Sequence, residues 1–462
     1  MNDQAKDFLT SAKKNEADYN FISAKESYLN IITYFKDSQE ASIARKRLQV
    51  MDELIKEKAI YERIDENAKK VLTDIGVNIA ASPRLMDILM EADAVNFESD
   101  TAVSLPLKRD YLEACLEKVE RSMPGDPGRN AFGTGATPPF LKRPGQDDLR
   151  AATREEFQRI AATVSENSDV VKIFSLPVAV DKSLTGYEAA QCMDVMFKGL
   201  KMTAAKSFSD DEMSFLKGKD NWLDGTSLIT SLSPMDSMVE PFIRSVKAGV
   251  NLLLLDLTIA GASGPASPEA LLTQIHAQVM FMMVMAQTLN PGVPCIHGGI
   301  PGVADTGGDL SYSSKSQPLI NAAMARLNQW VTKFPSAQSG GSTSITEVGD
   351  EAVLESAQSR DTLRKYSVHI LRHAMGALGS LNFFSEEKFV NDCIVERKSI
   401  NAFADDQENF RTRPLYFPED RYAMAGIREI AEKGNPKYAD HTLKNVEAFM
   451  KWEKSIWGKE LS

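Results

Sequence analysis

The sequence is poor in the residues and patterns that mark several large classes of protein. It has four cysteines in 462 residues, and none of them forms a CxxC pair. Cysteines spaced so widely indicate a reducing compartment rather than a disulfide framework, and they provide no thiolate zinc cluster. Residues 1–10 have neither the basic start nor the apolar core of a secretory signal. The most apolar runs, 251–257 and 279–286, are far shorter than the roughly 20 residues that span a bilayer. We therefore expect a cytoplasmic protein with no membrane partner.

The charge balance narrows the class of ligand. Lysine and arginine total 53 against 64 aspartates and glutamates, which gives a formal net charge of −11. A net acidic surface repels phosphate backbones, so we expect no nucleic acid partner, and a cationic or zwitterionic ligand is favoured over an anionic one. Hydrophobic residues make up 43% of the chain, which is enough to bury one large core and a smaller attached domain.

Three segments differ in their patterning. Residues 1–58 show apolar residues at helix spacing in two stretches, separated by a turn at 36–38. This resembles a single tetratricopeptide-type hairpin, which cannot bury its own apolar face. We expect it to dock on the rest of the chain, on a sister subunit of a homo-oligomer, or on another protein. Residues 59–150 mix helices with short extended pieces, and a third pattern fills 151–462.

In this third segment, short apolar runs alternate with helical patterns. Strands are predicted at 170–180, 201–206, 227–231, 251–257, 293–297 and 380–384, and helices at 186–198, 238–248, 268–289, 319–333 and 355–375. The alternation predicts parallel βα units in an α/β fold. It fits both a closed barrel and an open doubly wound sheet. No GxGxxG follows an early strand, which disfavours a dinucleotide site.

Several short motifs then occur in a particular order. Residues 259–266 read IAGASGPA, a helix follows, and 290–294 read NPGVP. The first resembles the strand-to-loop segment AGATGP of the trimethylamine methyltransferase superfamily, in which a helix also leads to NPGxP. Further segments that resemble the family, in its order, are 72–77, 151–153, 233–234, 386–392 and 441–443. The similarity runs from about residue 60 to about residue 460.

This resemblance implies a (β/α)8 TIM barrel with an N-terminal helical extension, and transfer of a methyl group to a Co(I) corrinoid. The chain holds only standard residues, so it is similar to the branch without pyrrolysine, whose members act on quaternary amines such as glycine betaine. No DxHxxG pattern for cobalamin occurs, so we expect the corrinoid on a separate corrinoid-binding protein, with none permanently bound. The stretch 340–351 lacks the Asp-Ala-Lys usual in the family, and this departure concerns the substrate.

Two polar residues at the ends of apolar runs are predicted to be catalytic. Reactive groups of a (β/α)8 barrel lie at the carboxyl ends of its strands. Asp256 lies in the run LLLLDL and His297 ends the run VPCIH, so we expect both to face the barrel mouth, where Asp256 would attract a substrate cation. The alternatives are a helix cap or salt bridge for Asp256, and a packed histidine bonded to backbone for His297.

Residues near the other predicted rim loops are assigned to ligands. Those expected to contact the substrate are Tyr312, Phe383, Phe384, Ser207 and Gln338, and those expected to contact the corrinoid are Gly298, Gly299, Asp305, Gly340, Gly341 and Ser342. Aromatic faces attract methylated cations. Most of the aromatic set Tyr312, Trp330, Phe334, Phe383 and Phe384 nevertheless fits a core.

A metal site is not predicted. Cys295 and His297 would share one face of a strand but lack two further ligands. His369 and His373 are four apart on a predicted helix with no HExxH glutamate between them, and His373 is assigned to the dipole at the helix end. Two competing functions remain: a metal-dependent barrel enzyme, and a non-catalytic binding protein that uses the helical hairpin for interaction.

Transfer of a methyl group from a quaternary amine requires no acid–base residues, which fits the sequence. When its methyl group is transferred, the leaving group is a neutral amine, so no proton is required. No convincing acid–base pair is present in the sequence. The tasks expected of the barrel are orientation, exclusion of water and placement of charge.

Overall fold

Eight parallel strands form the centre of the molecule. The computed structural model describes residues 2–79, 82–95, 104–128, 131–135, 137–143, 149–304, 309–368, 370–403, 414–415, 420 and 423–433. The strand order is β10-β11-β1-β3-β4-β5-β8-β9. The strands are β1 (Ala131–Thr134), β3 (Val171–Ser175), β4 (Leu200–Thr203), β5 (Trp222–Thr226), β8 (Leu252–Ala260), β9 (Cys295–Val303), β10 (Gln338–Ser339) and β11 (Ile370–Met375).

The sheet closes on itself between its two end strands. His297 of β9 forms a parallel bridge with Ser336, just before β10. Its N–H donates to the carbonyl of Pro335 at 2.8 Å, and its carbonyl accepts from Ala337 N–H at 3.1 Å. These bonds complete a ring of eight strands. The closed barrel, rather than the open doubly wound sheet, is the architecture.

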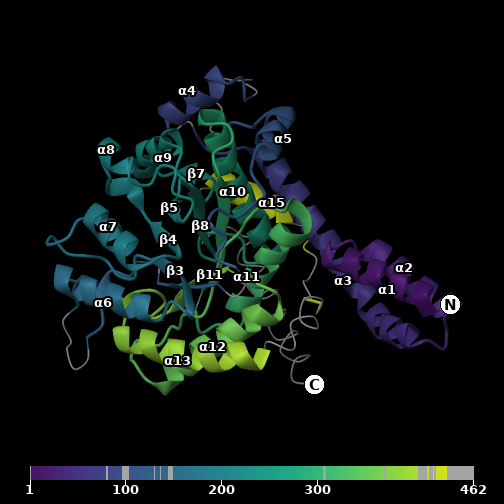
Figure 1. The fold of residues 1–462 in the computed structure, drawn as a ribbon. Helices are drawn as coiled ribbons and strands as arrows, with labels where there is room; N and C mark the ends of the chain where they lie inside the picture. The colour runs from purple at the N-terminus through teal and green to yellow at the C-terminus, as the bar shows by residue number, and fades with distance from the viewer. Residues whose placement is uncertain are drawn as a thin grey trace.

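Helices between consecutive strands cover the barrel (Figure 1). They are α6 (Arg154–Glu166), α7 (Gly186–Met196), the short η2 (Ala205–Ser207) and α8 (Asp210–Met213), α9 (Asp236–Ala248), α10 (Pro268–Leu289), α11 (Ser316–Leu327) with η3 (Asn328–Thr332), α12 (Asp350–Lys365) and α13 (Glu386–Phe403). Two small sheets lie beyond the strand ends: β12 (Ala377–Leu378), β13 (Phe383–Phe384) and β2 (Phe140–Leu141); and β6 (Ile229–Thr230) with β7 (Ser233–Pro234). The predicted (β/α)8 barrel is confirmed.

Helix α10 is a long helix that is buried along almost its whole length. Ser267 caps it by accepting a hydrogen bond from Ala270 N–H, and Pro268 occupies its first turn. Its bounds are those predicted from the sequence. It is the one helix in the described part of the chain that is long and apolar enough to cross a membrane, but its apolar window is completely buried inside the molecule. Its composition is therefore that of a core helix.

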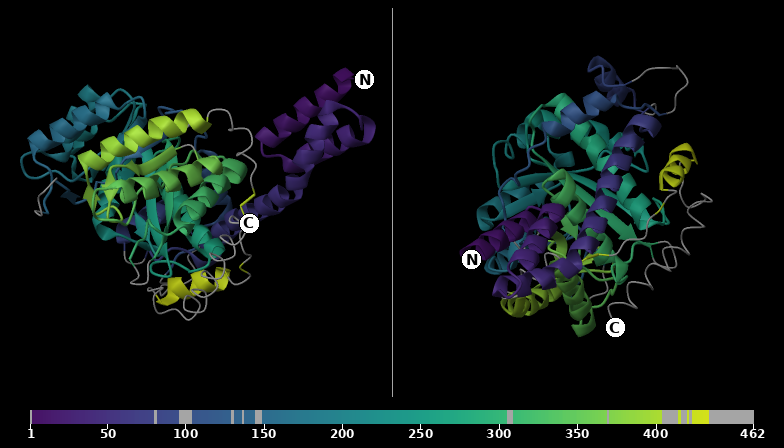
Figure 2. Two further views of the ribbon diagram at one scale, coloured as in Figure 1. Left: turned by 90° about the horizontal axis from the view of Figure 1, so that it is seen from below. Right: turned by 90° about the vertical axis from the view of Figure 1, so that its right-hand side faces the viewer.

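An N-terminal arm projects from one side of the barrel, as Figures 1 and 2 show. It consists of α1 (Asn2–Ala17), α2 (Phe21–Tyr34) and the first half of α3 (Gln39–Lys70). The base of the arm packs on η3 through aromatic rings: Tyr19 stacks on Trp330 at 5.8 Å between centroids, and Phe21 and Tyr61 meet the same indole edge-on. The arm thus docks on its own barrel.

Helix α3 continues from the arm onto the barrel without a break. It passes residue 58, where the sequence-based division places the end of the helical extension, and it continues into the π-turn η1 (Val71–Ile75). Gly76 ends it at φ +78°, where an added Cβ would lie 2.6 Å from the Leu105 backbone. Helices α4 (Pro83–Glu91) and α5 (Arg109–Glu117) follow before β1, and α15 (Ala423–Lys433) also packs on α10.

Several barrel strands differ from the prediction. Strand β10 was not among the predicted strands, and the predicted strand at 380–384 supplies only β13, in a small sheet outside the barrel. Residues 370–375 form β11 although the sequence predicted a helix over 355–375; α12 ends at Lys365 because Ser367 adopts φ +63°. A serine gives no such stop signal in a sequence, whereas a glycine does. Strand β5 lies a few residues before the predicted 227–231. Strand β1 lies at 131–134, ahead of residue 151.

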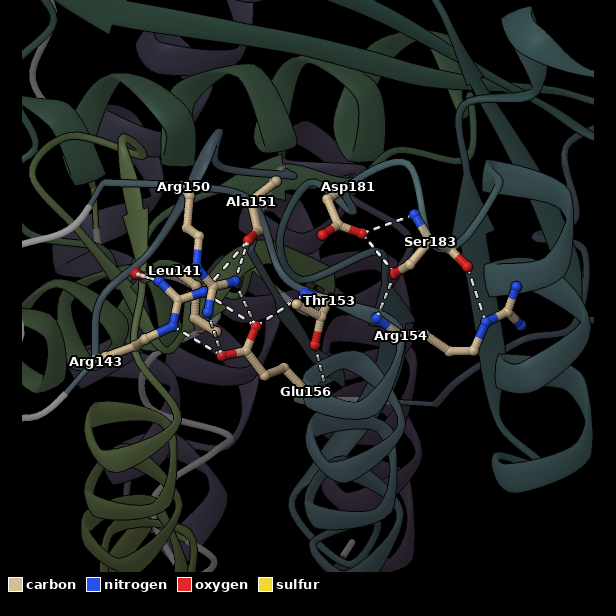
Figure 3. Close-up of polar contacts among 9 residues, drawn as sticks. All are labelled: Leu141, Arg143, Arg150, Ala151, Thr153, Arg154, Glu156, Asp181 and Ser183. Carbon is tan, nitrogen blue, oxygen red and sulfur yellow. Dashed lines mark hydrogen bonds and ion pairs between the residues drawn. The ribbon is translucent and has the colours of Figure 1, made fainter.

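A polar network fixes the start of α6 beside the barrel rim (Figure 3). Thr153 and Glu156 form a capping box, in which each side chain bonds the other residue's backbone N–H. Arg143 and Arg150 both bond the Glu156 carboxylate. These bonds, those of Arg143 first, hold the pKa of Glu156 well below its usual range.

Candidate active site

Apolar side chains fill the amino-terminal half of the barrel. Inward-facing residues form one cluster, made of Ala131, Ile173, Leu200, Met202, Leu223, Leu253, Ile296 and Ala337. Leu255 of β8 and Ile370 of β11 also pack against it. Side chains alternate between the two faces of a strand. The cluster therefore identifies the inward-facing positions further along each strand.

Beyond this apolar floor the barrel interior becomes polar. Ser339 follows Ala337 by two positions, Arg372 follows Ile370 by two, and the two residues are register partners on β10 and β11. Tyr312 reaches in from the segment between β9 and α11, with its hydroxyl 2.6 Å from Ser339 Oγ. Nδ1 of His373 lies 2.8 Å from the same oxygen. We call Tyr312, Ser339, Arg372 and His373 the mouth cluster.

His373 interrupts the alternation of β11. Its backbone φ is +61°, a region that non-glycine residues rarely adopt and that is often found at functional sites. As a result the consecutive residues Arg372 and His373 both reach the mouth cluster. The sequence-based placement of His373 at the end of a helix is wrong, because residues 370–375 form a strand.

The mouth cluster holds one positive charge at neutral pH. Burial lowers the pKa of Arg372 to about 10, which leaves the guanidinium charged. Burial, and then the charge of Arg372, hold the pKa of His373 well below its usual range, so the imidazole is neutral. Burial raises the pKa of Tyr312 to about 12, so the phenol keeps its proton. None of these groups changes its charge near neutral pH.

Asp256 lies on β8 but does not face the mouth. Its neighbours Leu253 and Leu255 face inward, and Asp256 points outward toward α10. Its oxygens accept hydrogen bonds from Thr258 Oγ1 at 2.8 Å and Gln278 Nε2 at 2.7 Å. Burial raises the pKa of this carboxyl to about 7. The expectation that it faces the mouth is wrong.

His297 also points away from the barrel interior. Ile296 before it belongs to the interior cluster, and the His297 ring lies against α10, with Nε2 3.1 Å from His276 Nδ1. His276 in turn lies 3.1 Å from Asp65 of α3. Burial, then the neighbouring His276, lower the pKa of His297 well below its usual range. The expected orientation toward the mouth is wrong here too, and the contacts are those of a packed histidine.

The predicted aromatic residues separate into different environments. Tyr312 belongs to the mouth cluster. Phe383 is half-buried beyond the strand ends, 6.1 Å from the ring of Phe140, whereas Phe384 is fully buried and packs on Phe389. Trp330 anchors the arm, and Phe334 lies under the guanidinium of Arg121.

The predicted glycine contacts are mainly packing contacts. A Cβ on Gly298 would lie 2.6 Å from the Leu254 carbonyl, one on Gly299 would strike Ile275 of α10, and ones on Gly340 and Gly341 would strike Leu363 and Arg360 of α12. Gly298 also offers its carbonyl to Arg372 Nη2 at 3.1 Å.

The remaining predicted site residues lie in different environments. Ser342 is completely buried, and its hydroxyl has no partner in the described part of the chain. Gln338 is buried on the outer face of β10, in register with Leu371. Ser207 is exposed, and Asp305 lies outside the described residues. Within the described ranges, no three His, Cys, Asp or Glu side chains are grouped so that they could hold a metal ion.

Sequence reasoning missed Arg372 and Ser339. Arg372 fell inside the helix predicted over 355–375. Ser339 lies directly before Gly340 and Gly341, which were assigned to the corrinoid, and it was given no role itself. A signal was present: one arginine in the apolar run Ile370–Met375 is costly to bury and suggests a special role.

A (β/α)8 barrel with an apolar floor and a polar cluster at the carboxyl ends of its strands is the architecture of an enzyme acting on a small molecule. The family model described as trimethylamine methyltransferase matches residues 33–456. The chain belongs to this family and is a methyltransferase.

Similar proteins carry related names. A glycine betaine methyltransferase of Desulfitobacterium hafniense is 24% identical over 411 residues, which cover 83% of this chain and 82% of that protein. Among solved structures, the monomethylamine methyltransferase of Methanosarcina barkeri is 10% identical with a TM-score of 0.45, covering 98% of this chain and 97% of that one. A hydroxylamine complex of monomethylamine methyltransferase gives 11% identity and a TM-score of 0.44, covering 88% and 94%.

Proposed function

We propose that this methyltransferase moves a methyl group from a small quaternary amine to the Co(I) corrinoid of a separate corrinoid-binding protein. Membership of the family supports the class of reaction, and the name of the Desulfitobacterium relative supports the class of substrate. The observation that carries the choice of a quaternary amine is the protonation state of the mouth cluster.

No group in the mouth cluster is suited to exchange a proton near neutral pH. His373 is neutral, Tyr312 stays protonated and Arg372 stays charged. General acid–base catalysis needs a group whose pKa lies near the working pH. Demethylation of a quaternary ammonium needs no such group, because the amine leaves as a neutral molecule without gaining a proton. A protonated tertiary amine would first have to lose its proton.

The mouth also carries exposed apolar side chains, to which we assign contact with the face of a corrin ring. Leu257 is on the inward face of β8, near its carboxyl end, yet 43% of it is exposed. Ala204, directly after β4, is exposed as well. When bound there, a reduced corrinoid supplies the cobalt nucleophile that accepts the methyl group.

The barrel's own residues hold and enclose the substrate in this proposal. The apolar floor closes the amino-terminal end, so the substrate enters and the methyl group leaves through the same mouth. Tyr312, Ser339 and His373 are held by their mutual hydrogen bonds, and they present a fixed polar wall that needs no rearrangement during the reaction. Exclusion of water from this wall protects the reduced partner from side reactions.

The test is a methyl-donor panel with the purified full-length chain and free cobalamin reduced to Co(I). Betaines, choline, trimethylamine and methylated sulfur compounds are compared by the absorbance change from Co(I) to methyl-Co(III). We expect at least one quaternary amine to react. Reaction with trimethylamine and with no quaternary amine would refute the proposal.

A further inference from the structure

Arg372 is a buried cation without a counter-ion in the described part of the chain. Its side chain lies on the inward face of β11, and the residue is 2% exposed. Nη2 donates to the Gly298 carbonyl at 3.1 Å, while Nε has no hydrogen-bond partner there. None of the ion pairs among the described residues includes Arg372. A buried charge left in this state is strongly unfavourable unless something else compensates it.

The other buried arginines of this protein provide an internal comparison. Each is matched by at least one carboxylate: Arg143 by Glu156, Arg326 by Glu57, Arg360 by Asp392 and Glu396, and Arg364 by Asp361 and Glu396. These pairs involve the helices around the barrel, α3, α6, α11, α12 and α13. Within the described ranges the chain therefore supplies carboxylates where it buries arginine for structural reasons, and Arg372 is the exception there.

The neighbours of Arg372 do not neutralise its charge. Tyr312 and His373 are neutral, and the hydrogen bonds of Ser339 go to these two residues. The guanidinium has donors in a planar fork, and such a fork fits both oxygens of a carboxylate. A simple tetraalkylammonium ion in the same mouth would be repelled by it. A zwitterion is not repelled if its carboxylate lies against Arg372.

We propose that Arg372 binds the carboxylate of a zwitterionic substrate at the barrel mouth and so makes this enzyme select a betaine over a methylated cation that has no carboxylate. This inference rests on the proposed function and specifies the substrate class of the same site. The carboxylate supplies the missing counter-ion, and it fixes the substrate so that the quaternary nitrogen and its methyl groups lie away from Arg372. Arg372 thereby acts as the specificity-determining residue of the mouth cluster.

The test measures binding in the absence of any corrinoid. Isothermal titration calorimetry with the full-length protein compares three probes: glycine betaine, 4-(trimethylammonio)butanoate as a longer betaine, and choline, which has the same trimethylammonium group but no carboxylate. The wild type should bind at least one betaine more tightly than choline. Arg372→Gln should lower the affinity for that betaine by about ten- to a hundredfold, the usual effect of losing a hydrogen bond to a charged group. Its affinity for choline should be unchanged or higher.

Three further variants control for charge and folding. Arg372→Lys keeps the charge and loses the fork, so its betaine affinity should be intermediate. Arg397→Gln removes an arginine whose ion pair with Asp169 lies on the surface, and it should leave all three affinities unchanged. Arg372→Met removes an unpaired buried charge, so without ligand its melting temperature should equal or exceed that of the wild type. A melting temperature well below wild type would mark Arg372 as a structural residue and overturn the proposal.

The outcomes separate this inference from the proposed function. Betaine binding that depends on Arg372, with no methyl transfer to Co(I), supports the carboxylate site and refutes the proposed reaction. Methyl transfer from choline as readily as from a betaine, unaffected by Arg372→Gln, supports the reaction and refutes the site. The inference is also overturned if Arg372→Gln loses affinity for choline and for the betaine equally, or if the wild type binds neither betaine.

Discussion

Asp256 is a buried carboxyl that the protein keeps protonated over an unusual range of pH. The pKa of this group in the folded protein is about 7, against roughly 3.9 for an unfolded aspartate. Between these two values the folded state holds a proton that the unfolded state has released. The stability contributed by this proton is complete below the unfolded pKa and is lost as the pH rises through the folded one.

Asp256→Asn should therefore change the pH dependence of stability. Asparagine can accept from Gln278 and donate to Thr258 without becoming charged. We expect the melting temperature of the variant, relative to wild type, to rise between about pH 5 and about pH 8, as linkage requires. Circular dichroism melts at a series of pH values measure it. A difference that stays constant over this range would contradict the raised pKa of Asp256.

His297→Ala should act mainly on stability. The variant loses the contact with His276 and removes the partner of its Nδ1, while its Nε2 keeps the contact with Asp65. A loss of about 1–3 kcal/mol in the free energy of unfolding is expected for such a buried polar group, measured by urea titration. Cys295→Ala, which alters the same outer face of β9, should cost less. Normal stability with weakened substrate binding would instead return His297 to the active site.

The orientation of these two residues could not be read from the sequence. Parallel strands buried on both faces are apolar at every position, so the alternation that separates inside from outside disappears. The run around Asp256 is apolar on both sides, and His297 follows a similar run. Chain position identified the correct strands, whereas the inward or outward direction depends on the register of the closed barrel, which is a tertiary property.

At the scale of single elements, helices were more predictable than strands. The bounds of α10 follow from local signals, a serine cap with proline after it and Asn290 followed by Gly292 beyond its end. Strand β11 carries no comparable signal. Its apolar residues continue the helical spacing of α12. The helix ends before Ser367, whose left-handed backbone conformation cannot be predicted from a serine in the sequence. The mouth cluster was missed together with this strand.

The capping box of α6 allows a matched comparison with that of α7. Glu156 bonds two arginines and is largely buried, whereas Glu188 caps α7 in the same way with Arg154 alone and is more exposed. Glu156→Ala should lower the free energy of unfolding by about 2 kcal/mol at neutral pH. Glu188→Ala should have a smaller effect.

The effect of Glu156→Ala should also depend on pH. The pKa of Glu156 is depressed in the folded protein, so its contribution is present above the unfolded value of roughly 4.3 and is lost as the pH falls through the folded one. Urea titrations at neutral pH and at a series of lower values down to about pH 2 provide the comparison. Equal losses for the Glu156 and Glu188 variants would show that the two arginines add nothing to the cap.

At the scale of the whole molecule, one buried and one partly exposed ion pair join α3 to the barrel. Glu57 of α3 bonds Arg326 of α11 at 2.7 Å, and it also accepts from Leu415 N–H. Arg63 bonds Glu269 at the start of α10. Together with the rings around Trp330, these contacts make α3 part of the barrel's outer layer as well as the support of the arm.

Glu57→Gln should be strongly destabilising because it leaves Arg326 buried beside a neutral group. A loss of about 3–5 kcal/mol is typical when one partner of a buried pair is removed. The double variant Glu57→Gln, Arg326→Met should recover part of this loss, since the uncompensated charge is gone. Chemical denaturation of the two single variants, the double variant and the wild type gives the coupling. Additive losses would show that the pair does not act as a unit.

The unbroken course of α3 has a mechanical consequence. A helix of 32 residues is about 48 Å long at 1.5 Å per residue, and it contains no proline or glycine at which it could bend easily. Its far end carries α1 and α2, and its near end is fixed against α10 and α11. The arm is therefore expected to move as one rigid rod, which is held to the barrel at Trp330. A pull on its tip would reach the barrel wall as torque and would not be absorbed by a hinge.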